Sequence, residues 1–210
     1  MKLYIQKNMS DVKDSYSLRA LVTRLGLQIN FKPQEVHWCK WKPAEQEAFM
    51  LNTDGSVQEN GNGYGGTIHD GLGFVVRAYA GCSSKNSIIY QEIQAIAVGL
   101  KQPQELGIEN LEVNSDSLGA INILNGNERC PWYCSNMVAY IRCLTSSIVK
   151  CSFSHIFREG NRVADYLSKL YRSPEEGVVL FSLPLDAKLH HIIEEDRIGT
   201  MYPRFSSNTG

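Results

Sequence analysis

The stretch Met50–Gly66, MLNTDGSVQENGNGYGG, begins with alternating apolar and polar residues and continues into a run of glycine and asparagine. The alternation predicts a short strand over Phe49–Thr53, because successive side chains of a strand point to opposite faces of a sheet. Glycine and asparagine are typical of turns. Asp54 is therefore expected to end the strand, either as an ordinary turn residue or as one member of a carboxylate cluster.

Two further strands are predicted next, over 65–70 and 73–81, joined by the hairpin signal Asp70-Gly71. Beyond them, the spacing of apolar residues alternates between the period of 3.6 residues typical of helices and the period of two typical of strands. Helices are expected over 91–100, 117–125, about 135–147 and 161–171, and strands over 110–116 and 149–157. The order βββαβααβα predicts an α/β fold with a mixed sheet covered by helices.

Length and composition favour one sizeable α/β domain, since the chain has 210 residues and 43% hydrophobic content. The charges, 21 basic against 22 acidic residues, provide no overall field that attracts nucleic acid. The six cysteines follow no metal-binding spacing and are expected to be reduced thiols. No apolar run is long enough to cross a membrane, so we expect a soluble intracellular protein, nuclear or cytoplasmic.

Three regions are expected along the chain. Residues 1–46 are mixed and polar, with prolines and tryptophans, and predict an N-terminal arm. Residues 47–171 contain the regular pattern of the α/β domain. Residues 172–210 predict an irregular C-terminal tail with one short helix. The arm and the tail are candidate surfaces for a protein partner.

Four acidic residues occupy comparable positions on the predicted elements. Asp54 and Asp116 each end a strand, while Glu92 and Asp165 lie in the opening turns of helices. Each has an ordinary explanation, as a turn residue, an N-cap, a helix-dipole charge or an i,i+4 partner of Lys169. If the first and fourth strands are parallel neighbours, however, the two aspartates leave the sheet at the edge where open α/β sheets bind ligands.

Four carboxylates gathered at one edge would repel one another, so such a cluster makes sense only around cations. Ligands that are all oxygen favour Mg²⁺ or Mn²⁺ over zinc. Two such ions are suited to the attack of water on a phosphodiester.

Five blocks of the sequence, in order, carry a resemblance to a known family: LNTDGS (51–56), GGTIHD (65–70), QEIQAIAVGL (91–100), VNSDS (113–117) and HIFREGNRVADYLSKL (155–170). Together they resemble the ribonuclease H type-1 domain of plant reverse-transcriptase-like proteins derived from non-LTR retroelements. The resemblance covers about residues 38–171. It implies the RNase H-like fold, a five-stranded mixed sheet of order 3-2-1-4-5 with helices on both faces.

The same resemblance implies a metal-dependent endoribonuclease that hydrolyses the RNA strand of RNA–DNA hybrids. It assigns two Mg²⁺ or Mn²⁺ ions to Asp54, Glu92, Asp116 and Asp165. It matches His155 to a histidine that assists proton transfer or product release, although His155 also fits an ordinary histidine at a strand end.

Substrate contacts are implied for three asparagines near the predicted site. Asn60 and Asn62 lie in the glycine-rich stretch, and Asn86 precedes the helix that carries Glu92. Such residues let a backbone approach the sugars of an RNA strand, although they also serve any hairpin. Because the chain has no dense basic segment, we expect weak, salt-sensitive binding that a protein partner could reinforce.

The alternative function is a domesticated, catalytically weak module of RNase H fold that binds nucleic acid or another protein. The fold cannot decide between the two, because function resides in the site. The presence of all five functional residue types favours the enzyme, and the sequence carries no signal for an oligomeric state.

Overall fold

The structure is a computed structural model that describes residues 12–13, 16–32, 35–45, 47–59, 61–170, 177–181 and 186–205. The chain divides into two compact units. One consists of Met1–Trp38 together with Tyr202–Gly210, and the other consists of Cys39–Met201. Each unit is described by itself.

The first unit contains short elements. Strands β1 (Val12–Lys13) and β2 (Phe31–Lys32) pair in parallel on either side of helix α2 (Tyr16–Arg24). Strand β3 (Val36–Cys39) pairs with β10 (Tyr202–Phe205), so segments from opposite ends of the sequence form a two-stranded sheet.

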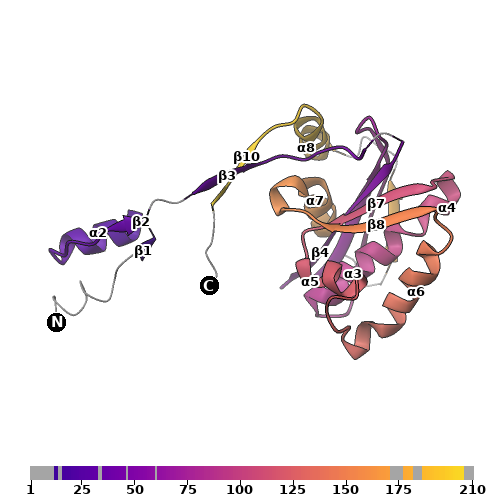
Figure 1. Cartoon of the computed structure of the whole chain (residues 1–210), viewed down its shortest axis with the longest axis horizontal. Helices are drawn as coiled ribbons and strands as arrows, with labels where there is room; N and C mark the ends of the chain where they lie inside the picture. The colour runs from indigo at the N-terminus through magenta and orange to yellow at the C-terminus, as the bar shows by residue number, and fades with distance from the viewer. Residues whose placement is uncertain are drawn as a thin grey trace. The chain divides into compact units, whose positions relative to one another are not determined.

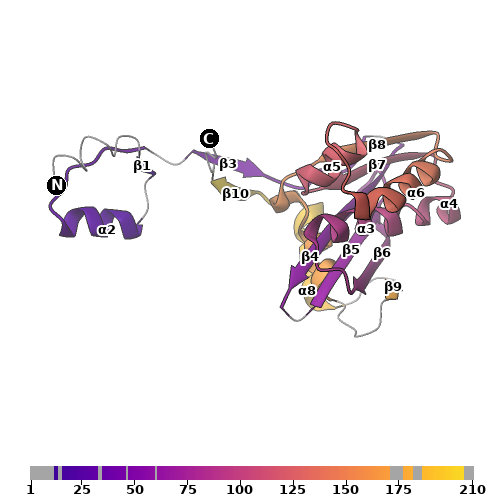
Figure 2. The same cartoon turned by 90° about the horizontal axis from the view of Figure 1, so that it is seen from below.

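A six-stranded mixed sheet is the centre of the second unit (Figures 1 and 2). Its strand order is β8-β7-β4-β5-β6-β9. The central strand β4 runs parallel to β7 and antiparallel to β5. The strands are β4 (Phe49–Gln58), β5 (Gly61–His69), β6 (Val75–Ser83), β7 (Asn110–Ser115), β8 (Lys150–His155) and β9 (Gly177–Phe181).

The predicted fold class is confirmed, because β4 to β8 follow the expected order 3-2-1-4-5. The sheet also has a sixth strand, β9, where an irregular tail was expected. The sequence of β9, GVVLF, is rich in residues that favour strands, and β9 pairs antiparallel with the edge strand β6. A second difference is that β4 continues to Gln58, five residues beyond the predicted end at Thr53.

Helices cover both faces of this sheet. The larger apolar core joins it to α3, α5 and α6, and a smaller core joins it to α7 and α8. The helices are α3 (Ile88–Gly99), α4 (Gln102–Leu106), α5 (Leu118–Leu124), α6 (Ser135–Thr145), α7 (Arg162–Leu170) and α8 (Ala187–Arg197). None of the helices in the described ranges is both long and apolar enough to cross a membrane.

Helix α3 begins where its sequence provides a cap. The Ser87 side chain accepts a hydrogen bond from the backbone N–H of Tyr90, which satisfies one of the free donors of the first turn. The predicted apolar stripe of this helix, which includes Ile93 and Ile96, is fully buried. Helix α3 is thereby fixed against the sheet next to β4, and this position determines where its acidic residue lies.

Candidate active site

Asp54 lies on β4, and Asp116 directly follows β7, the strand that runs parallel beside β4. The register of β4 and β7 pairs Thr53 with Ser115, and each of these residues is followed directly by one of the two aspartates. The predicted parallel pairing of the first and fourth strands is therefore confirmed. Asp54 lies inside β4, opposite Gly65, so its expected place at the strand end is wrong. The reason is that Gly55–Gln58 stay extended and pair with Gly61–Tyr64 of β5.

Glu92 reaches this place because α3 packs very closely on β4. A Cβ atom at Gly55 would lie only 2.4 Å from the backbone nitrogen of Glu92, so only glycine allows this approach. The backbone N–H of Gly55 donates a hydrogen bond to the Glu92 carboxylate. The Ser115 hydroxyl donates a second one, with 3.2 Å between Oγ and Oε2.

The result is a cluster of three carboxylates. One oxygen each of Asp54, Glu92 and Asp116 lies within 4.8 Å of the others. Asp54 and Glu92 are buried and Asp116 is half-buried. We call these three residues the acidic cluster.

Burial and mutual repulsion disfavour the ionised forms of this cluster. Burial, followed by the negative charge of Asp116, raises the pKa of Asp54 to about 7. Burial, followed by the charges of Asp54 and Asp116, holds the pKa of Glu92 well above its usual range. A divalent cation would remove this penalty, and three converging carboxylates match the oxygen ligands that Mg²⁺ and Mn²⁺ prefer. The donor set therefore fits a metal site.

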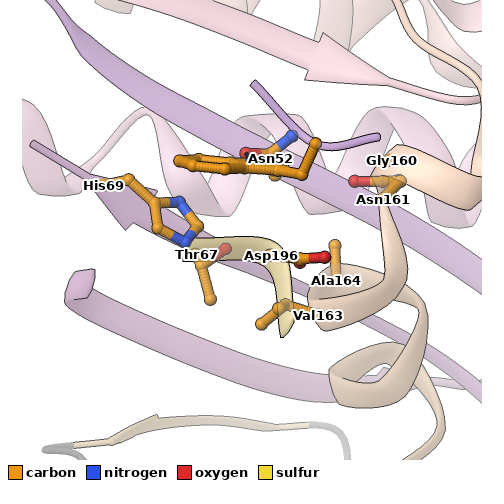
Figure 3. A pocket seen from close by; sticks show the side chains of 9 residues that line it. Asn52, Thr67, His69, Gly160, Asn161, Val163, Ala164 and Asp196 are labelled. Carbon is orange, nitrogen blue, oxygen red and sulfur yellow. Dashed lines mark hydrogen bonds between the residues drawn. The ribbon is translucent and has the colours of Figure 1, made fainter. Parts of the chain in front are cut away.

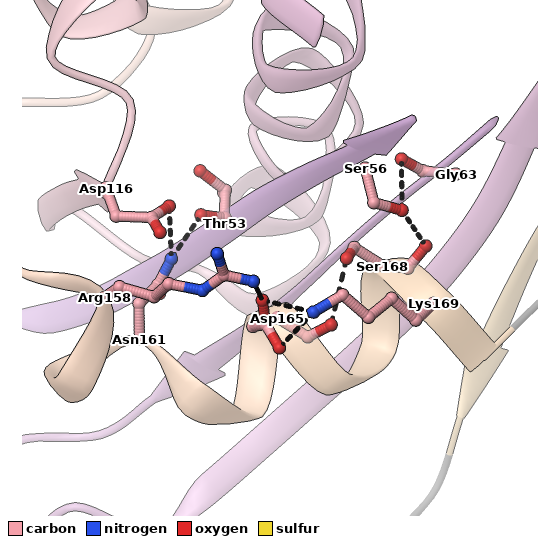
Figure 4. Close-up of polar contacts among 9 residues, drawn as sticks. All are labelled: Thr53, Ser56, Gly63, Asp116, Arg158, Asn161, Asp165, Ser168 and Lys169. Atoms are coloured by element: carbon pink, nitrogen blue, oxygen red, sulfur yellow. Dashed lines mark hydrogen bonds and ion pairs between the residues drawn. The ribbon is translucent and has the colours of Figure 1, made fainter. Parts of the chain in front are cut away.

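Asp165 lies near the acidic cluster but is held by cations of the chain (Figure 4). Its charge contributes to the raised pKa of Asp54, so the two groups interact. The Asp165 carboxylate accepts hydrogen bonds from Arg158 at 2.5 Å and from the Nζ of Lys169 at 2.5 and 2.6 Å. The structure thus brings three of the four predicted acids together and pairs the fourth with Arg158 and Lys169.

Asn161 belongs to the site, although the sequence did not single it out. Its amide nitrogen donates to the Thr53 carbonyl at 2.8 Å and to Asp116 Oδ1 at 3.1 Å (Figure 4). Its side chain is buried, so these bonds fix the orientation of the Asp116 carboxylate. In the sequence, Asn161 directly precedes an amphipathic helix, where asparagine is expected to cap the helix. Its contacts with Thr53 and Asp116, which are distant in the sequence, could not be predicted from that position.

The structure describes three of the four remaining candidates. His155 is exposed at the end of β8, with its ring in edge contact with Phe157 at a centroid distance of 5.9 Å. Asn62 is half-buried in β5, and Asn86 is exposed just before α3. Asn60 lies outside the described residues. The roles of these four residues stay predictions.

This sheet order, with converging carboxylates beside its two central parallel strands, defines an RNase H-like domain. Residues 52–171 match the sequence model of the reverse transcriptase-like family. The match covers more than half of the chain, and the chain belongs to this family.

Several solved structures share this fold. The N-terminal RNase H domain of Rv2228c from Mycobacterium tuberculosis is 18% identical, with a TM-score of 0.55 over 58% of this chain and 90% of that chain. RNase H1 from Halobacterium salinarum is 20% identical, with a TM-score of 0.55 over 58% and 94%. LC11-RNase H1 from compost, in complex with an RNA/DNA hybrid, is 24% identical, with a TM-score of 0.53 over 57% and 92%. Comparison with curated proteins finds no match.

Proposed function

We propose that this protein is a metal-dependent ribonuclease H that hydrolyses the RNA strand of RNA–DNA hybrids. The observation that carries the proposal is the acidic cluster, in which oxygens of Asp54, Glu92 and Asp116 lie within 4.8 Å of one another. Three converging carboxylates, two of them buried, repel one another and are costly to the fold unless a cation compensates them. Membership of the reverse transcriptase-like family supports the same reading.

The residues of the chain take distinct roles in this proposal. Asp54, Glu92 and Asp116 hold Mg²⁺ or Mn²⁺, and Asp165 joins them when its ion pairs open. The chemistry that two such ions supply when bound is activation of water and stabilisation of the departing oxygen. Asn161 keeps the Asp116 carboxylate in place through its hydrogen bond.

The outer part of the proposed site would contact the substrate. His155 is exposed and is the candidate for carrying a proton to or from the reacting groups. Asn62 and Asn86 are the described candidates for contacts to the sugars of the hybrid, together with Asn60. The net charge of −1 supports weak intrinsic binding, with residues 1–46 and 172–210 as candidate regions for a targeting partner.

A second candidate function is a module that binds nucleic acid or protein without useful turnover. The observation that favours it is the pairing of Asp165 with Arg158 and Lys169, which takes one predicted metal ligand away from the cluster. In this case the fold and three acids persist while the fourth acid serves as a structural ion-pair partner.

Cleavage of a labelled RNA–DNA hybrid in the presence of Mg²⁺ tests the proposal. We expect cleavage by the wild type and none by Asp54→Asn, which keeps the shape of the side chain but removes its charge. Asp186→Asn is the matched control, because asparagine can also cap α8 and Asp186 lies outside the site. Equal traces of cleavage in wild type and Asp54→Asn would indicate contamination and support the binding module.

A further inference from the structure

A narrow cavity lies between the sheet, α7 and α8, next to Asn161 (Figure 3). It is too narrow to admit a water molecule. Trp41 and five polar side chains contribute to its lining: Asn52 of β4, Thr67 and His69 of β5, Asn161, and Asp196 of α8.

Each of the five polar side chains has one buried atom without a hydrogen-bond partner. The atoms are Asn52 Nδ2, Thr67 Oγ1, His69 Nδ1, Asn161 Oδ1 and Asp196 Oδ1. All five residues are at most 5% exposed. Across the described part of the chain, seven buried side-chain atoms have no hydrogen-bond partner, and five of them belong to residues that line this one cavity. Since buried polar groups are almost always paired, this concentration requires a cause.

Two of these atoms have a fixed chemical character. The Asn161 nitrogen is used by Thr53 and Asp116, so the Asn161 oxygen faces the cavity and can only accept. The Asn52 oxygen accepts from Trp41 Nε1 at 3.3 Å, so the Asn52 nitrogen faces the cavity and can only donate. Thr67, His69 and Asp196 can each act either way, according to where their hydrogens lie.

No water molecule fits, and neither Asn52 Nδ2 nor Thr67 Oγ1 makes a hydrogen bond, so the remaining polar groups of the lining are those of His69 and Asp196. The Asn161 oxygen needs a donor, and a protonated carboxyl group on Asp196 is one. Burial raises the pKa of Asp196 to about 7, against the opposing charge of Arg162, and burial lowers the pKa of His69 to about 4. Both groups can therefore be uncharged near neutral pH, as a dry cavity requires.

We propose that Asp196 is a positioning residue for the acidic cluster, because its carboxyl group completes the hydrogen bonding of the Asn161 amide that holds Asp116. The effect on metal binding rests on the proposed function. The link between Asp196 and Asn161 rests on the cavity and on the burial of Asp196. Helix α8 lies beyond the part of the chain that matches the family, residues 52–171, so this link makes α8 a support of the site.

Two shape-matched variants of the full chain test the link. Asp196→Leu keeps the outline of the side chain but removes both oxygens, whereas Asp196→Asn keeps a donor. The first measurement is the side-chain NH₂ signal of Asn161 in nitrogen-15 NMR spectra without metal, and the second is Mn²⁺ affinity by calorimetry. In Asp196→Leu we expect a shifted, faster-exchanging Asn161 signal and roughly tenfold weaker Mn²⁺ binding, whereas Asp196→Asn restores both.

Asp186→Ala is the control for general loosening of α8. Asp186 caps this helix by accepting a hydrogen bond from the Leu189 N–H, away from the cavity. We expect a lower melting temperature in this variant with the Asn161 signal and Mn²⁺ affinity of the wild type. If Asp186→Ala reproduced the effects of Asp196→Leu, docking of α8 would explain them and the proposal would fail.

The other outcomes also decide the matter. An unchanged Asn161 signal or unchanged Mn²⁺ affinity in Asp196→Leu overturns the proposal, as do equal losses in Asp196→Leu and Asp196→Asn. Absence of Mn²⁺ binding by the wild type would overturn the proposed function and, with it, the effect on the cluster. The Asn161 signal would still show separately whether Asp196 holds Asn161.

Discussion

The guanidinium group of Arg158 donates a hydrogen bond of 2.5 Å to the carboxylate of Asp165, the acid that the family resemblance assigns to a metal. Lys169, one turn further along α7, binds the same carboxylate. Two cations of the chain therefore neutralise Asp165, while Asp54, Glu92 and Asp116 repel one another nearby. Metal binding through all four acids requires that these ion pairs open.

Replacing both cations should strengthen metal binding. In the double variant Arg158→Gln with Lys169→Gln, Asp165 no longer has competing partners. We expect Mn²⁺ affinity to rise by about two- to fivefold, the range that partly exposed ion pairs supply. Calorimetric titration measures it, and Arg197→Gln, which removes an exposed ion pair with Glu194, should leave the affinity unchanged. Unchanged or weaker binding in the double variant would show that Asp165 is not a ligand.

Gly55→Ala should destabilise the fold strongly. The added Cβ would lie 2.4 Å from the Glu92 nitrogen and 2.5 Å from the Gln91 carbonyl carbon, so β4 and α3 would have to separate. We expect a loss of about 1–3 kcal/mol in the free energy of unfolding, measured with urea. Gly119→Ala in α5 is the control, because its Cβ would meet only Ile89 Cδ1, at 3.6 Å, and alanine favours helix. Similar effects of the two changes would contradict the close packing described for α3.

Acid should destabilise the wild type through His69. Burial lowers the pKa of His69 from 6.5 to about 4 in the folded protein. The contribution of neutral His69 to the free energy of unfolding is therefore complete above pH 6.5. It is lost as the pH falls towards 4. Relative to His69→Gln, the wild type should lose about 2–3 kcal/mol of unfolding free energy between pH 7 and pH 4.5. Urea unfolding at both pH values measures the difference, and parallel behaviour of the two proteins would refute the burial argument.

Divalent metal should stabilise the wild type against heat. If Mn²⁺ binds the folded acidic cluster and not the unfolded chain, as proposed, a free Mn²⁺ concentration of about 100 times the dissociation constant adds about 2.7 kcal/mol to the free energy of unfolding. We expect the melting temperature to rise with Mn²⁺ and to return to its starting value with a chelator. Asp54→Asn should lose this response but should be more stable than the wild type without metal at pH 8, because it removes a repelled, buried charge. A rise of equal size in Asp54→Asn would place the metal elsewhere.

Most of the core architecture follows from local patterns in the chain. The alternation in Asn110–Ser115 and the apolar stripe of α3 reflect periods of two and of 3.6 residues, which neighbouring side chains show directly. The β-prone run of β9 was missed because a short isolated strand becomes recognisable only through its partner. The end of β4 was misplaced because glycine and asparagine serve both turns and closely packed strands.

The acids themselves could be named from sequence, since each stands at a characteristic place on an element and the motifs around them occur in order. The hydrogen bonds, ion pairs and burial of these residues could not be predicted from sequence. The pairing of Asp165 with Arg158, the role of Asn161 and the burial of Asp196 all depend on which atoms meet in space. Asn161 lies 108 positions from Thr53 and 45 from Asp116. Such contacts depend on the packing of α7 and α8 against the sheet, and no local period in the chain encodes them.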